Sequence, residues 1–144
     1  MSKESERVYI EGRMATIFGS AHPEVPLGFQ NSNFIEPKES LFVRFHIMGG
    51  KGVAIGGAGG FSVVTRYPGI VQATVWTPDE SGMSLANKII DNVKSIFEYH
   101  RGRDVEGDVI TFKAAEFPNQ AATHGWHPVI VKIPFYRDQV TPVG

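Results

Sequence analysis

One stretch decides the fold class: Met83-Ser84-Leu85-Ala86-Asn87-Lys88-Ile89-Ile90-Asp91-Asn92-Val93-Lys94-Ser95-Ile96-Phe97-Glu98-Tyr99. Its apolar residues recur at helical spacing and fall on one face: Leu85, Ile89, Ile90, Val93, Ile96 and Phe97. Ser81 or Ser84 is expected to cap the start, and Gly102 is placed to end the helix. The stretch therefore predicts an amphipathic helix over residues 83–99 that packs its apolar face on a sheet.

Strands are predicted on both sides of this helix, because side chains alternate in character along four segments. These segments are 41–48, 70–77, 109–117 and 129–136. In the last segment, Pro134 lacks an amide donor and indicates a sheet edge or a strand end. We therefore expect a sheet of four to five strands.

A further helix is predicted near the N-terminus, over residues 5–18, with Gly19 placed to end it. Its approximate apolar stripe is Val8, Met14, Ile17 and Phe18. Residues 20–40 hold several prolines and glycines and predict an irregular connection. Together these elements predict an α+β fold in one domain, residues 1–144. We expect a two-layer arrangement, in which a mostly antiparallel sheet carries both helices on one face and a long glycine-rich hairpin.

Composition excludes several classes of function. The 144 residues carry a net charge of −1 and no cysteine, which excludes thiol catalysis and thiolate metal sites. The polar start does not resemble a signal peptide, and no apolar run has the length of a membrane span. The densest basic spot, Arg101-Gly102-Arg103, precedes Asp104 and is typical of a solvated helix end. We therefore expect a cytoplasmic protein without a membrane partner that binds DNA weakly.

A glycine-rich segment, residues 49–60, separates two of the predicted strands and holds seven of the sixteen glycines. It fits no phosphate-binding loop, because Lys51 is followed by Gly52 and no helix comes next. One interpretation is a flexible hairpin tip; another is a hairpin arm that orders against a neighbouring subunit. The second interpretation assigns these interface residues: Gly49, Gly50, Lys51, Gly52, Val53, Ile55, Gly57, Gly60 and Phe61.

Catalytic and metal-binding patterns are weak. His124 and His127 are the one close histidine pair, but glycine and proline around them favour a loop, and no third ligand has suitable spacing. No Gly-x-Ser-x-Gly motif is present. The neighbouring residues His100, Asp104, Glu106 and Asp108 are typical of a polar connection between a helix and a strand. We therefore expect no catalytic centre, no metal and no cofactor.

Several segments, read together, resemble one family. They are Pro26-Leu27-Gly28-Phe29-Gln30-Asn31-Ser32-Asn33-Phe34, Leu41-Phe42-Val43-Arg44-Phe45, Tyr67-Pro68-Gly69-Ile70-Val71-Gln72-Ala73-Thr74-Val75-Trp76-Thr77-Pro78, and Trp126 followed by Val129-Ile130-Val131-Lys132-Ile133-Pro134-Phe135-Tyr136. Their order resembles that of tail terminators and related minor tail proteins of phages with long non-contractile tails. The resemblance covers residues 26–137.

This resemblance implies a structural virion protein and not an enzyme. It implies a hexameric ring of identical subunits that ends tail-tube polymerisation and forms the docking surface for the head-completion or neck protein. The tail tube protein would be a second partner, and DNA would only pass through the lumen. The implied location is the head-proximal end of the tail, after assembly in the host cytoplasm. The alternatives are a neck or head–tail connector protein, and a small-ligand-binding α+β domain that uses the glycine-rich loop.

Overall fold

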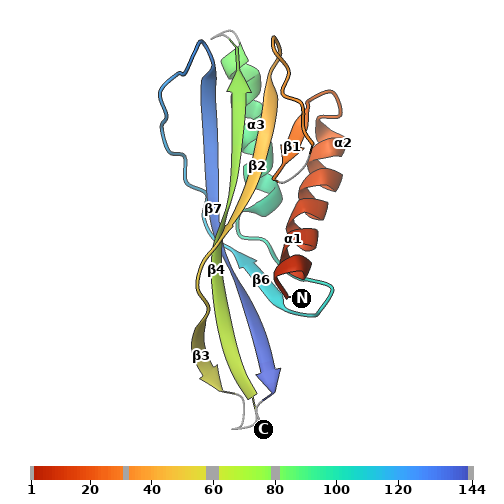
Figure 1. Cartoon of the computed structure of the whole chain (residues 1–144), viewed down its shortest axis with the longest axis vertical. Coiled ribbons are helices and arrows are strands. Elements are labelled where there is room, and N and C mark those ends of the chain that lie inside the picture. The colour runs from red at the N-terminus through yellow and green to blue at the C-terminus, as the bar shows by residue number, and fades with distance from the viewer. Residues whose placement is uncertain (1, 31–32, 58–61, 79–81, 143–144) are drawn as a thin grey trace.

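The computed structural model describes residues 2–30, 33–57, 62–78 and 82–142 (Figure 1). The first helical segment is continuous and consists of α1 (Ser2–Arg13), a π-helical turn η1 (Met14–Phe18) and α2 (Gly19–Ala21). The second helix is α3 (Met83–Phe97). The strands are β1 (Leu27–Phe29), β2 (Phe42–Gly49), β3 (Val53–Gly57), β4 (Ser62–Thr77), β5 (Arg101–Arg103), β6 (Val109–Phe112) and β7 (His127–Pro142).

These strands form one mixed sheet in the order β1-β2-β4-β7-β6-β5, with β3 also paired to β4. The pair β1 and β2 is parallel, and the other pairs are antiparallel. The α+β class is confirmed, whereas the expected number of four to five strands is too low for the described residues. The prediction gave no separate strand for β1, β3 or β5, and β3 lies in the segment expected as a glycine-rich hairpin. Strand β1 lies in the proline-rich connection, and Arg101–Arg103 is an edge strand rather than a helix end.

Both helical segments pack against the same core of the sheet. Aromatic rings connect its elements in sequence: Phe45, Phe97, Phe112 and Phe135 have successive ring centroids 5.7, 5.1 and 5.4 Å apart. These separations lie in the favourable range for aromatic pairs. Phe97 thus links α3 to β2 and β6 and is completely buried. No helix in the described part of the chain is long and apolar enough to span a membrane.

Helix α3 confirms the central sequence prediction with small corrections. Leu85 is exposed and Ala86 is buried instead, so the buried face is rotated slightly toward Ala86. The helix ends at Phe97, because Glu98 leaves the helical conformation with a ψ of 126° and Tyr99 then adopts a left-handed φ of 60°. Gly102 does not end the helix. It lies in β5, where an added Cβ would stand 1.9 Å from Tyr9 Oη. No side chain caps the start of α3, and Ser81 lies outside the described residues.

The first helical segment differs more from the prediction. Its buried apolar residues are Ile10, Met14 and Phe18, spaced four residues apart, whereas Val8 and Ile17 are exposed. The segment also continues through Gly19 to Ala21, since Gly19 has helical dihedral angles.

Two long strands, β4 and β7, pair over their full 16 residues, from Ser62 opposite Pro142 to Thr77 opposite His127. The predicted segments 70–77 and 129–136 are only the halves that lie under the helices. Pro134 is therefore inside β7 and not at a strand end. Its carbonyl oxygen accepts a hydrogen bond from the Lys113 amide at 2.8 Å, so its nitrogen faces the side where β6 has already ended. The predicted strand 109–117 is correspondingly shorter, because β6 ends at Phe112.

Candidate functional site

Three strands continue beyond the helices as a ribbon, which we call the arm (Figure 1). The arm consists of β3, residues 62–68 of β4 and residues 137–142 of β7. Residues 62–68 form the middle strand, with β3 paired on one side and β7 on the other. The figure shows this ribbon at the opposite end of the sheet from the start of α3. The arm is therefore a sheet extension that reaches beyond both helices, and only its root at Tyr67 and Arg137 lies against α1.

The glycine-rich segment forms one side of the arm. Gly49 ends β2, and residues 50–52 cross to β3, so both strands pair in succession with the same edge of β4. The Gly50 amide donates to the Pro68 carbonyl oxygen at 2.8 Å within this crossing. Lys51 and Gly52 belong to the crossing as well. Of the remaining predicted interface residues, Val53, Ile55 and Gly57 lie in β3, and Gly60 and Phe61 lie outside the described residues.

Close packing explains why glycine occurs at the crossing. An added Cβ at Gly52 would lie 2.5 Å from Tyr67 Cε1, and one at Gly50 would lie 2.9 Å from Pro68 Cγ. Real Cβ atoms essentially never approach that closely. The chain can therefore cross the root of the arm there only without a side chain.

Large apolar side chains are exposed on the arm. Val53 is 59% exposed, Ile55 is 48% exposed and Val140 is 60% exposed. Val53 pairs with Arg66, and Val140 pairs with Val64 two residues along β4, so Val53, Val64 and Val140 share one face. The register of β3 shifts between Ala54 and Gly56, which puts Ile55 at an irregularity of the edge strand. An apolar cluster of this kind, which no described helix or strand covers, is typical of an interaction surface.

Next to this apolar cluster, the same face of the arm carries an ion pair between Arg66 and Asp138. Arg66 donates two hydrogen bonds to Asp138, each 2.9 Å long, and its guanidinium lies 3.7 Å above the Tyr136 ring. The hydrogen bond to Asp138 is the main reason that the pKa of Arg66 is raised. The arm thus presents apolar residues beside a fixed pair of opposite charges.

A buried ion network fixes the root of the arm to the body. Arg137, only 3% exposed, donates to Glu6 Oε1 at 3.1 Å and to Asp108 Oδ2 at 3.0 Å. It also donates to Gln139 Oε1 at 3.1 Å, and its guanidinium lies 4.4 Å from the centre of the Tyr67 ring. This one side chain therefore connects α1, the turn before β6, and both long strands of the arm.

Burial raises the pKa of the carboxyl groups in this network, and Arg137 opposes the rise. Burial is the largest influence on both Glu6 and Asp108, and each is raised above its ordinary pKa. Asp104 Oδ1 holds the neighbouring turn by accepting the amides of Glu106 and Asp108, both at 3.0 Å. Asp108 and Oδ1 of Asp104 therefore have structural partners, whereas the buried Asp104 Oδ2 accepts no hydrogen bond from the described residues.

The other candidate groups are not brought together in a reactive arrangement. His100 contacts Tyr9, with 2.6 Å between Nε2 and Oη, and burial lowers its pKa. His124 lies in a tight turn and His127 begins β7. Within the described ranges, no three histidine or carboxylate side chains are grouped so as to hold a metal ion.

The sequence did not predict the role of Arg137 or the participation of β7 in the arm. Arg137 and Glu6 are 131 positions apart, so no local pattern connects them. The alternation in side-chain character along β7 stops after Tyr136, because residues 137–139 are all polar, so a longer strand had no clear signal in the sequence.

Comparison with known proteins adds evidence on the fold. No protein-family model matches the chain, and no curated protein matches its sequence. A solved protein structure is similar, with a TM-score of 0.75 and 20% identity, over 99% of this chain and 99% of that one. At this level of identity the likeness shows the fold alone.

Proposed function

We propose that this chain is a structural assembly protein of a long-tailed phage, a tail terminator that caps the tail tube as a hexameric ring. The arm is the observation that carries the proposal. Its apolar cluster is exposed among the described residues, and the buried Arg137 network joins the arm to the body. The sequence resemblance to tail terminators, described above, supplies the identity of the assembly.

The arm also suits the geometry of a ring. A ring forms when one patch of each subunit binds a different patch of the next subunit. The arm lies at one end of the elongated sheet, and the helix-covered body forms the rest of the subunit (Figure 1). We infer that the arm of one subunit contacts the body of the next, which buries Val53, Ile55 and Val140 at every interface.

The low net charge of the chain is consistent with a ring whose lumen lets DNA pass through. The net charge of −1 leaves few groups to neutralise phosphates, and Arg66 and Arg137, the arginines of the arm, are both paired with carboxylates. A ring of such subunits would let DNA slide past without tight binding.

The test is a tube-capping assay. The purified chain is mixed with the tail tube protein of the same virion while the tube polymerises, and tube lengths are measured by electron microscopy. We expect shorter tubes that carry extra density at one end. The test variant carries Val53→Thr and Ile55→Thr, which keep β-branched residues in β3 but remove most of its apolar surface, and it should cap fewer tubes than the natural chain. Unchanged lengths and bare tube ends with the natural chain would contradict the proposal.

A further inference from the structure

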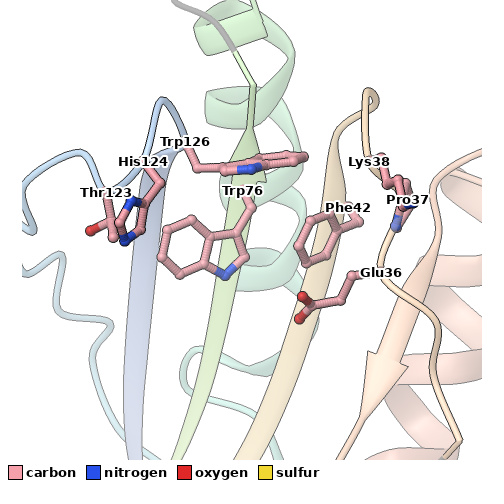
Figure 2. A pocket seen from close by; sticks show the side chains of 8 residues that line it. All are labelled: Glu36, Pro37, Lys38, Phe42, Trp76, Thr123, His124 and Trp126. Carbon is pink, nitrogen blue, oxygen red and sulfur yellow. The ribbon is translucent and has the colours of Figure 1, made fainter.

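A pocket of about 460 Å³ lies at the other end of the sheet from the arm (Figure 2). Aromatic side chains form its walls: Phe42 from β2, Trp76 from β4 and Trp126 from the segment before β7. Phe42 and Trp76 are paired across the two strands and share one face. Their neighbours Val43 and Val75 lie in the core, so this face is the one away from the helices. Trp126 lies across them, with its ring 5.3 Å from that of Phe42 at an interplanar angle of 69°.

A tight turn holds Trp126 in this position. The amides and carbonyls of Thr123 and Trp126 exchange two hydrogen bonds of 2.9 Å. The two residues between them, His124 and Gly125, have left-handed φ values of 50° and 82°. Such values are uncommon for a residue with a side chain and are found where the surrounding structure demands them. The unusual backbone conformation of His124 therefore belongs to a turn that holds the Trp126 indole over the pocket.

A carboxylate completes the arrangement. Figure 2 shows the Glu36 carboxylate below the Phe42 ring and to one side of the Trp76 indole, on the side of the pocket opposite Trp126. Its ion-pair partner within the described residues is Arg44, whose Nε lies 4.0 Å from Glu36 Oε2. That separation is longer than a charge-assisted hydrogen bond, so this carboxylate has capacity to accept a further donor.

We propose that the pocket binds an arginine side chain presented by a partner protein. A guanidinium stacks on aromatic faces, is attracted by their π electrons and pairs with a carboxylate through two parallel hydrogen bonds. The chain itself contains this arrangement, since Arg66 lies over Tyr136 and forms two hydrogen bonds with Asp138. The pocket presents a similar receptor, aromatic rings with a carboxylate, but here the nearest arginine, Arg44, reaches the carboxylate only at 4.0 Å.

Charged residues at the rim of the pocket predict how two substitutions change its affinity for an arginine side chain. Lys38 lines the pocket and is exposed, so its positive charge opposes a bound cation. Removing that charge with Lys38→Gln should strengthen arginine binding, whereas Glu36→Gln should weaken it. A merely apolar pocket would respond to neither substitution in this way.

Tryptophan fluorescence provides the measurement, because both tryptophans of the chain line the pocket. The probe is N-acetyl-arginine amide, titrated into the whole chain at constant ionic strength. We expect saturable binding with a dissociation constant on the order of 1 mM. Glu36→Gln should weaken binding about tenfold, as expected for losing one charge-assisted contact. Glu39→Gln, at another exposed carboxylate nearby, should leave binding unchanged.

Two further probes decide the class of ligand. The citrulline analogue of the probe has nearly the same shape without the charge and should not bind. Tetramethylammonium tests for a site that takes any organic cation, and it should bind more weakly than the arginine probe. Equal binding of the citrulline analogue, tighter binding of tetramethylammonium, or no effect of Glu36→Gln would each overturn the proposal. The outcome does not depend on whether the chain forms a ring.

Discussion

Replacing Arg137 with alanine is expected to lower the free energy of unfolding by about 3–5 kcal/mol, measured by urea or thermal denaturation. The guanidinium is buried and is the ion-pair partner of both Glu6 and Asp108. Its removal leaves these two carboxyl groups at the root of the arm without their counter-charge. Removal of one partner from a buried ion pair is costly because the remaining charge has lost both water and its counter-ion.

The control is Arg66→Ala, which removes another arginine of the arm that pairs with a carboxylate and covers a tyrosine ring. The side chain of Arg66 is much more accessible to water than that of Arg137. An exposed ion pair contributes at most about 1 kcal/mol, so this variant should lose far less stability. Equal losses for the two variants would show that burial of the Arg137 network does not determine its contribution.

The loss caused by Arg137→Ala should also depend on pH. Burial raises the pKa of Glu6 above its ordinary 4.5 and that of Asp108 above its ordinary 3.8, and the guanidinium opposes both shifts. Without the guanidinium, the pKa values of both carboxyl groups in the folded protein rise further. Between the ordinary and the folded-state pKa, the folded protein therefore keeps protons that the unfolded chain has released. Stability then falls as pH rises from these ordinary values through the folded-state pKa. The variant should therefore lose less stability at about pH 5 than at about pH 8.

Removing the arm is expected to abolish ring assembly and to leave the body folded. In the variant, an Asn-Gly turn replaces residues 51–67 and joins Gly50 to Pro68, which are already hydrogen-bonded neighbours. The chain also ends after Asp138, so that no unpaired strand remains. All three strands of the arm are shortened together. Deleting β3 alone would leave the equally long ends of β4 and β7 in place.

A milder variant separates loss of assembly from loss of fold. Val53→Thr, Ile55→Thr and Val140→Thr together keep all three strands but remove the exposed apolar cluster. If each side chain contributes about 1 kcal/mol when its exposed half is buried, each interface loses about 3 kcal/mol, or roughly a hundredfold in affinity. Val105→Thr, at an exposed valine outside the arm, is the matched control and should assemble normally. Full assembly of both arm variants would show that the arm is only a tolerated loop.

Local sequence patterns were sufficient to predict the centre of the fold. The helix over Met83–Phe97 and the helix-covered halves of β2, β4 and β7 follow from periodicity, because each buries one regular face. The spacing of Ile10, Met14 and Phe18 was equally regular. The prediction instead included Val8 and Ile17, which lie on the exposed side of the same helix.

The full lengths of β4 and β7 could not be predicted from local propensity. Pro68 and Gly69 resemble a turn, but both lie inside β4. Pro68 is tolerated because its nitrogen faces the crossing between β2 and β3. Gly69 is required because an added Cβ would lie 2.4 Å from Phe135 Cζ. Both reasons are tertiary contacts, as are the Arg137 ion pairs and the convergence of Glu36 with Trp76 and Trp126.

The central claim is that this chain assembles into a closed ring, and its mass in solution tests that most directly. Native mass spectrometry of the full chain would be recorded over a range of concentrations, alone and with the tail tube protein, with electron micrographs of the same samples. We predict one discrete assembly with the mass of six chains, visible as rings, which is absent for the variant without the arm. A chain that stays monomeric at every concentration, with the tube protein present as well as absent, would contradict the account.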